Sequence, residues 1–121
     1  GAPLVRANFT SLKTKYPLAL ASVGPFTNDA AVRNFFQNAN CSGDCRSMFA
    51  AQFLATAMNA LDPDFAAQGV EFGGKCVSVS DLLTEANAGA AGATKNWYVS
   101  YKSIFDDINN SRQTPCLTVV D

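Results

Sequence analysis

The four cysteines are the feature that most limits how this chain can fold. They lie at Cys41, Cys45, Cys76 and Cys116 of a 121-residue sequence. An even number of cysteines in a short chain is typical of the disulfide framework of an extracellular domain. A zinc site would need closely spaced pairs of the C-x2-C type, and the spacings of three, thirty and thirty-nine intervening residues do not supply them. We therefore expect two disulfides, no metal, and a secreted, extracellular or cell-surface protein.

Length and charge indicate one globular domain, residues 1–121, and exclude several classes of partner. The chain is close to the commonest domain size, and its 48% hydrophobic residues can fill one core. The net charge is −1 and no basic cluster occurs, so we expect no binding to nucleic acid. No apolar run approaches the roughly 20 residues of a transmembrane helix, and membrane insertion is not expected either.

Helical spacing of apolar residues after position 26 predicts a mainly α fold of about four helices. These are expected to begin near Thr27, Asp44, Ser78 and Thr94. A small β-hairpin is predicted between the second and third helices, where Gly73 and Gly74 separate two short apolar segments. The side chains expected to form one buried cluster are Phe49, Phe53, Leu54, Met58, Leu82, Ile104, Phe105 and Ile108.

Residues 1–26 are expected to form an extended arm, and residues 27–121 the helical core. Three prolines punctuate this first segment, and no sustained periodicity is visible. The segment is nevertheless rich in apolar side chains, which invite association when exposed. We expect the arm to dock on a protein partner or on another copy of the chain, although packing on its own domain is the alternative. The residues expected to carry the interaction are Leu4, Val5, Phe9, Leu18 and Leu20. Residues 117–120 form a second candidate, as a terminal strand with an open edge.

The absence of histidine argues most directly against catalysis. Without histidine there is no Ser-His-Asp or Cys-His pair and no imidazole base. Paired carboxylates remain, but each pair has a structural explanation at a helix end or on a polar helix face. These pairs are Asp62 with Asp64, Asp81 with Glu85, and Asp106 with Asp107. A calcium site at the first pair lacks regular ligand spacing. We expect a protein that is not an enzyme and has no cofactor.

Two further features concern carbohydrate. Trp97 and Tyr98 are candidates for stacking on a sugar ring, with Tyr98 expected to be exposed and Trp97 more often part of a buried stripe with Tyr101. Exposure of the Trp97 ring separates sugar binding from protein packing. Three Asn-x-Ser/Thr sequons are candidate glycosylation sites, at Asn8, Asn40 and Asn109.

Residues 41–116 resemble a recurring segment of secreted bacterial proteins. C-R-S-M at residues 45–48 and A-Q-F-L-A-T-A-M-N-A-L at 51–61 are similar to C-S-N-M…L-S-A-Q-L-A-A-M-x-L-N-V-L. V-S-D-L-L-T-E-A-N-A at 79–88 and the N-N…T-P-C end at 109–116 resemble later motifs in the same order. The pattern occurs in C-terminal regions of repeat-bearing cell-surface and extracellular proteins. The resemblance implies a structural, adhesive or assembly role and no catalytic residues.

The same resemblance bears on disulfide pairing. Its pattern keeps cysteines that match Cys45 and Cys116, which favours pairing these two and joining Cys41 to Cys76. The local alternative joins Cys41 to Cys45 across Gly43, because glycine permits a tight turn. The sequence thus predicts a non-catalytic subunit of an extracellular assembly, such as a filament, surface layer or secreted complex, with a carbohydrate-binding module as the alternative.

Overall fold

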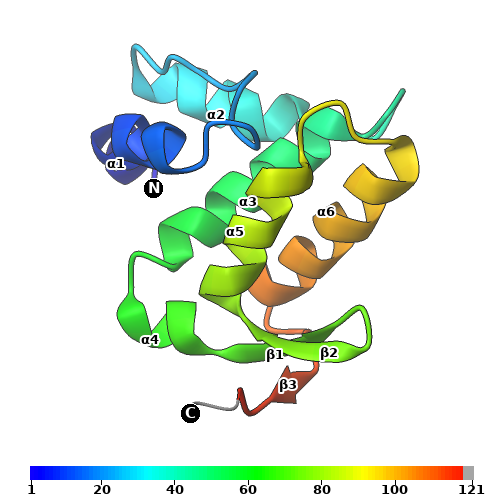
Figure 1. Ribbon diagram of the computed structural model, residues 1–121. Coiled ribbons are helices and arrows are strands. Elements are labelled where there is room, and N and C mark those ends of the chain that lie inside the picture. Colours follow the sequence, from blue (N-terminus) through cyan, green and yellow to red (C-terminus); the bar gives the residue numbers. More distant parts are fainter. Residues whose placement is uncertain (119–121) are drawn as a thin grey trace.

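The structure, a computed structural model, describes residues 1–118 and is mostly helical with a small sheet (Figure 1). Its helices are α1 (Ala2–Lys15), α2 (Asp29–Asn38), α3 (Arg46–Asn59), α4 (Pro63–Ala67), α5 (Val79–Gly89) and α6 (Lys95–Asn109). Its strands are β1 (Gly69–Phe72), β2 (Lys75–Ser78) and β3 (Pro115–Cys116). The mainly α fold with a hairpin is confirmed, with six helices in the described residues where about four were expected. Within residues 1–118, no helix combines the length and apolar character needed to cross a bilayer.

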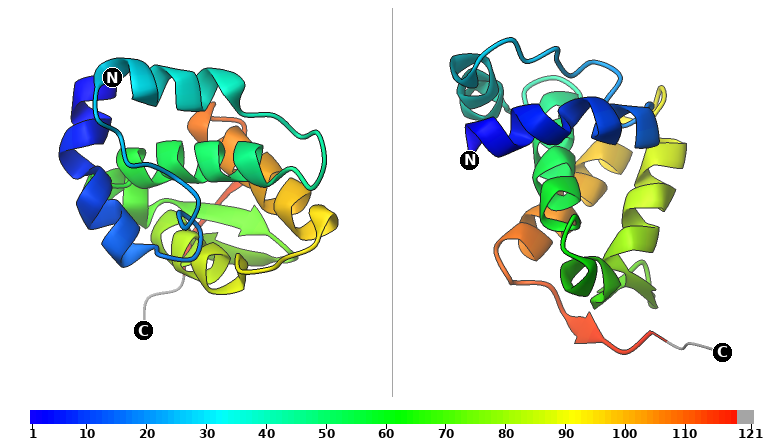
Figure 2. Two further views of the ribbon diagram at one scale, coloured as in Figure 1. Left: turned by 90° about the horizontal axis from the view of Figure 1, so that it is seen from above. Right: turned by 90° about the vertical axis from the view of Figure 1, so that its left-hand side faces the viewer.

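Helix α3 is the centre of the molecule and packs against α6, α5 and α1 (Figures 1 and 2). Its buried face carries aromatic rings that meet those of α6, with ring centroids 5.4 Å apart between Phe53 and Phe105. Seven of the eight side chains predicted for the core are buried. The exception is Met58, which is partly exposed. The three-four spacing therefore identified the inner face of α3 correctly, apart from its last turn.

Among the described residues, side-chain caps lie at the start of four helices, α2, α4, α5 and α6. The hydroxyls of Ser78 and Thr94 accept hydrogen bonds from the third residue beyond, as predicted for the starts of α5 and α6. Helix α2 begins slightly later than expected, because Asn28 rather than Thr27 accepts the hydrogen bond from the N–H of Ala31. These local interactions explain why the helix starts were visible in the sequence.

The predicted extended arm is wrong, because most of residues 1–26 belongs to α1 and the turns that follow it. Pro3 lies in the first turn of α1, where its missing N–H would be unpaired in any case. Side chains at four- and three-residue spacing then make one buried stripe that packs on the domain itself. These are Val5, Phe9, Leu12 and Tyr16. The alternative of packing on its own domain is thus the one that the structure contains.

The sheet has the strand order β2-β1-β3, and both pairings are antiparallel. The predicted hairpin forms with Gly73 and Gly74 in its turn, both at positive φ. Strand β3 pairs Pro115 and Cys116 with the start of β1. The terminal strand was expected two residues later, at residues 117–120. Leu117 and Thr118 lie beyond the strand, and residues 119 and 120 lie outside the described residues.

The disulfides join Cys41 to Cys45 and Cys76 to Cys116. The pairing favoured by the resemblance is wrong, and the local alternative is present. Cys76 and Cys116 lie on the two strands that flank β1, with their Cα atoms 6.0 Å apart. The bridge passes close to Gly69, where an added Cβ would collide with the backbone oxygen of Cys116. The first pair closes the loop before α3, where Asp44 accepts the N–H of Arg46.

Candidate interaction site

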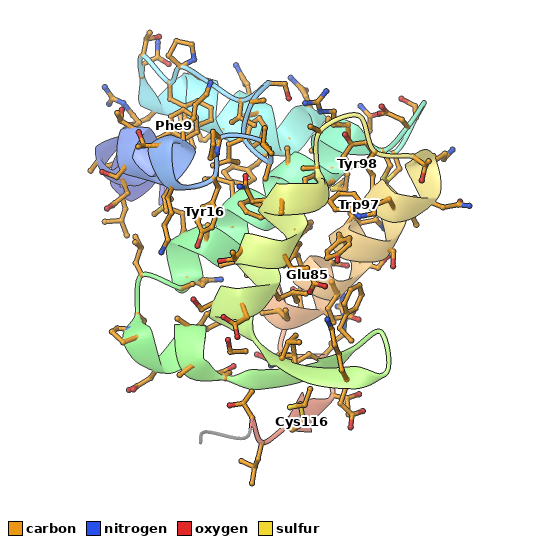
Figure 3. The ribbon with its side chains drawn as sticks, viewed as in Figure 1. Phe9, Tyr16, Glu85, Trp97, Tyr98 and Cys116 are labelled. Carbon is orange, nitrogen blue, oxygen red and sulfur yellow. A yellow bond between two sulfur atoms is a disulfide. The ribbon has the colours of Figure 1, made fainter. Side chains whose placement is uncertain are left out.

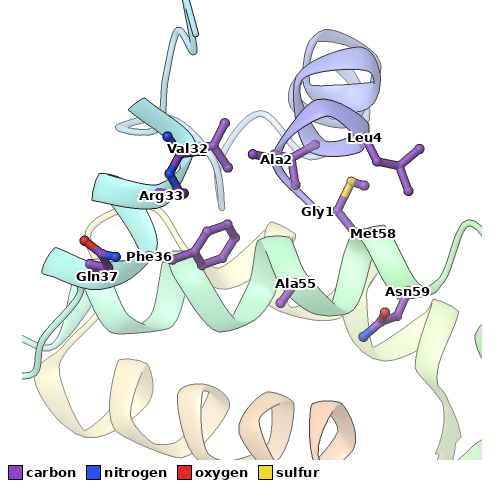
Figure 4. A pocket seen from close by; sticks show the side chains of 11 residues that line it. Gly1, Ala2, Leu4, Val32, Arg33, Phe36, Gln37, Ala55, Met58 and Asn59 are labelled. Carbon is purple, nitrogen blue, oxygen red and sulfur yellow. The ribbon is translucent and has the colours of Figure 1, made fainter. Parts of the chain in front are cut away.

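An apolar groove of about 490 Å³ lies where α1, α2 and the C-terminal half of α3 meet (Figure 4). Val5 and Val32 form its buried base, and Leu4, Phe36 and Met58 leave apolar surface open to solvent. We name this feature the N-terminal groove. Its lining residues are Gly1, Ala2, Leu4, Val5, Val32, Arg33, Phe36, Gln37, Ala55, Met58 and Asn59. A concave apolar surface with a few polar groups at its edge has the chemistry of a binding site.

The walls of the groove are held together at the start of α2. The guanidinium of Arg6 on α1 donates a 3.0 Å hydrogen bond to the carboxylate of Asp29 and a 3.3 Å bond to the carbonyl of Thr27. The Asp29 carboxylate also lies in the first turn of α2, where the helix dipole favours a negative charge. These contacts join α1 to the start of α2 beside the groove.

Arg33 provides the charge of the groove. It is the only charged side chain among the described residues that line the groove, and none of them is a carboxylate. Asp29 lies one helical turn before Arg33 but pairs with Arg6 instead. Within residues 1–118, no hydrogen bond or salt bridge of the Arg33 guanidinium is present. The groove therefore offers a cation at its edge to an acidic group on a ligand.

The residues predicted to carry the interaction separate into three groups. Leu4 and Val5 line the groove, and Leu4 is 58% exposed. Phe9 and Leu20 are buried in the core of their own domain. Leu18 is exposed but lies outside the lining of the groove, in a turn whose backbone N–H donates to Asn87 on α5. Sequence reasoning missed Arg33, Phe36 and Met58 as groove residues, because the groove exists only once α1 packs as a helix.

Trp97 and Tyr98 do not form a common surface for a sugar (Figure 3). Tyr98 is 1% exposed, and its hydroxyl donates a 2.6 Å hydrogen bond to the carbonyl of Ala90. The prediction that Tyr98 is exposed is therefore wrong. Consecutive residues on a helix point about 100° apart, so Tyr98 was expected to face away from the buried stripe that contains Trp97. Tyr98 is buried all the same, because α6 packs against other elements on more than one side. Trp97 is partly buried, with its ring 5.2 Å from that of Phe49.

A second aromatic cluster crosses from α6 to the hairpin. The ring of Tyr101 lies 4.4 Å from that of Trp97 and 5.0 Å from that of Phe72. An added Cβ at Gly89 would lie 2.9 Å from the indole of Trp97, so this glycine allows α5 to approach the ring closely. Burial, and then the charge of Glu85, raise the pKa of the Tyr101 hydroxyl.

The three sequons differ in how much their side chains contribute to the fold. The Asn109 amide donates to the backbone carbonyl and the side-chain oxygen of Gln52, and its oxygen accepts from Thr56 and Asn59. Asn8 donates to a carbonyl of its own helix α1. Asn40 is exposed in the loop before α3. Glycosylation stays a prediction at all three positions, and the loop position offers the most open attachment point.

The carboxylate pairs have structural partners or positions. Asp62 caps α4 through the N–H of Asp64, and Asp106 and Asp107 both contact Arg112. Asp81 lies in the first turn of α5, and Glu85 pairs with Lys75. In the part of the chain that the structure describes, no group of three or more potential metal ligands comes together.

Comparison with known proteins adds no relative. No protein-family model, no curated protein and no solved structure matches this chain. The resemblance of residues 41–116 to secreted bacterial proteins therefore stays a prediction, and the N-terminal groove remains the strongest candidate site on structural grounds.

Proposed function

We propose that this protein is a non-catalytic, extracellular protein-interaction subunit that docks its partner through the N-terminal groove. The observation that carries the proposal is the groove itself, which combines an open apolar surface with one cation that has no partner among the described residues. Patches of exposed apolar surface with a polar rim are typical of protein-binding sites. The two disulfides support an oxidising compartment, where such bonds persist.

The residues available for catalysis also favour a binding role. The sequence contains no histidine. The titratable groups at the groove are limited to the guanidinium of Arg33 among the described side chains, and a guanidinium is a poor acid and base at neutral pH. The mostly apolar side chains of the groove are therefore suited to binding a partner.

The experiment uses a variant that fills the groove. Ala55 lies on α3 at the groove, and Ala55→Arg places a long side chain there while keeping a strong helix former. Oxidised wild-type protein and the variant are immobilised and exposed to the extracellular fraction of the source organism. Retained proteins are identified by mass spectrometry. We expect a protein, including copies of this chain, that the wild type retains and Ala55→Arg does not.

The carbohydrate alternative provides the second arm of the experiment. Its best remaining surface is the cluster of Trp97, Tyr101 and Phe72, so the matched variant is Tyr101→Ala. Retention on insoluble polysaccharides that Tyr101→Ala abolishes and Ala55→Arg preserves would favour a carbohydrate-binding module. Equal protein retention by wild type and Ala55→Arg, or no retention of any protein, would overturn docking through the groove.

A further inference from the structure

We propose that the N-terminal groove is occupied by a second copy of this chain, which inserts Leu61 into it and places an acidic turn against Arg33. This inference rests on the proposed function, because it names the partner of the same groove. The groove supplies apolar surface and a cation, and the turn that follows α3 supplies the complementary groups.

Leu61 projects from a turn that is already ordered. It is 48% exposed, and the turn is held by hydrogen bonds from the N–H of Leu61 to the carbonyl of Met58 and from the N–H of Asp62 to that of Asn59, both 3.2 Å long. A single exposed leucine is ordinary on a protein surface. Because the backbone of Leu61 is hydrogen-bonded in this turn, docking of its side chain costs little additional backbone entropy.

The charges on the turn complement those of the groove. Asp62 and Asp64 follow Leu61 in the chain, on either side of Pro63, and both are exposed. Asp62 accepts the N–H of Asp64 as the cap of α4, and within residues 1–118 neither carboxylate forms a salt bridge. Over the same residues, Arg33 is likewise unpaired. A carboxylate of the turn and the Arg33 guanidinium are therefore available to each other across an interface.

The position of the turn explains how two copies can satisfy both sites at once. Met58 and Asn59 line the groove, and Leu61 follows two residues later. Groove and turn thus lie at the same end of α3. A two-fold axis beside this end would place each Leu61 at the groove of the other copy, which gives an isologous interface. A cavity of about 490 Å³ falls in the size range that holds drug-sized molecules, and one leucine with part of its turn fits that range.

The test is the mass of the oxidised protein in solution, measured by sedimentation equilibrium over a concentration series. We expect a species of twice 12.8 kDa that forms with increasing concentration. Leu61→Glu and Ala55→Arg should weaken this dimer by about 30-fold or more, as the loss of a central side chain does at other interfaces. Leu117→Glu is the matched control, because Leu117 is 94% exposed and does not line the groove. It should leave dimerisation unchanged.

Charge exchange makes the test specific to the proposed contact. Arg33→Asp and Asp64→Arg should each weaken the dimer by about tenfold, because two ion pairs become repulsive contacts in each homodimer. An equimolar mixture of the two variants should form a heterodimer, since each chain then carries the charge that the other lacks. Circular dichroism and denaturant unfolding of each variant confirm that these exposed substitutions leave the fold intact.

The outcomes separate this inference from the proposed function. A wild type that stays monomeric but retains an extracellular protein through the groove overturns the second-copy assignment and leaves docking in place. A dimer that Leu61→Glu leaves unchanged, or mixed charge variants that stay apart, also overturns it. A monomer that retains no partner overturns both.

Discussion

The interface between helices α3, α5 and α6 encloses several large side chains completely, whereas the region of α1, α2 and their connection leaves several aromatic rings half-covered. Phe49, Phe53 and Phe105 are fully enclosed between helices. In contrast, Phe26, Phe35 and Phe36 are only partly buried, although their rings pack in sequence against one another. We call helices α3, α5 and α6 the scaffold, because each is surrounded on several sides, whereas the pair α1 and α2 leaves apolar surface exposed.

The covalent links follow the same division. The Cys76–Cys116 disulfide closes a long segment and joins the C-terminal strand to the sheet next to α5. The Cys41–Cys45 disulfide closes only the loop that leads into α3. Helices α1 and α2 contain no cysteine and are held by packing and by the Arg6–Asp29 ion pair. The scaffold is thus stabilised by both packing and a long-range cross-link.

The largest expected difference between the two regions concerns one phenylalanine from each. Phe53→Ala should lower the free energy of unfolding by about 3–5 kcal/mol, because it opens a cavity in an enclosed core. Phe36→Ala should cost only about 1–2 kcal/mol, since part of its ring already faces solvent. Guanidinium unfolding monitored by circular dichroism measures both. Equal losses would show that the α1–α2 pair is packed as tightly as the scaffold.

The two disulfides should also contribute unequally. In the chain-entropy model, closing the loop between Cys76 and Cys116, which are 40 residues apart, adds about 4 kcal/mol to the free energy of unfolding. Closing the loop between Cys41 and Cys45, which are four residues apart, adds about 2 kcal/mol. Replacing each pair with alanine and measuring thermal unfolding tests this order. Peptide mapping without reduction must first find these two pairs. A larger loss from the short loop would mean that the loop before α3 anchors the scaffold.

The third expected effect concerns the amide network that joins α3 to α6. Asn109→Ala should lower the free energy of unfolding by about 1–3 kcal/mol, because Gln52 and the buried hydroxyl of Thr56 then each lose a hydrogen-bond partner. Asn8→Ala is the matched sequon control in the α1–α2 region. Its amide bonds only within α1, so it should change stability by less than about 0.5 kcal/mol. Urea unfolding measures the stability of both variants. Equal losses for Asn109→Ala and Asn8→Ala would show that the amide network between α3 and α6 does not stabilise the fold.

The smallest effect should appear at alkaline pH. The fold raises the pKa of Tyr101, so the unfolded chain loses this proton first as pH rises. The resulting loss of stability should begin near the ordinary tyrosine pKa of about 10 and grow until the folded pKa is passed. Tyr101→Phe should lose this part of the pH dependence while keeping the aromatic contacts. Identical pH profiles of wild type and variant, measured by urea unfolding, would contradict the assignment.

Local interactions made several features predictable from the sequence alone. Ser78 and Thr94 cap helices through residues three positions ahead, and Gly73 and Gly74 adopt the positive φ of a tight turn. The inner face of α3 was visible because its apolar residues recur at helical spacing. Each of these signals lies within a few residues of the position that it determines. Composition likewise excludes histidine chemistry for any fold that this chain could adopt, because the sequence contains no histidine.

Tertiary packing decided the remainder, because those features depend on residues far apart in the chain. Three prolines made residues 1–26 look extended, yet Pro3 fits the first turn of α1, and burial of the stripe containing Phe9 against the domain stabilises the helix. Tyr98 is buried because α6 has neighbours on two sides, and Cys76 meets Cys116 because both flank β1. The N-terminal groove needs α1, α2 and α3 in place together. A local pattern shows which face of a helix is apolar, and only the assembled fold shows what covers it.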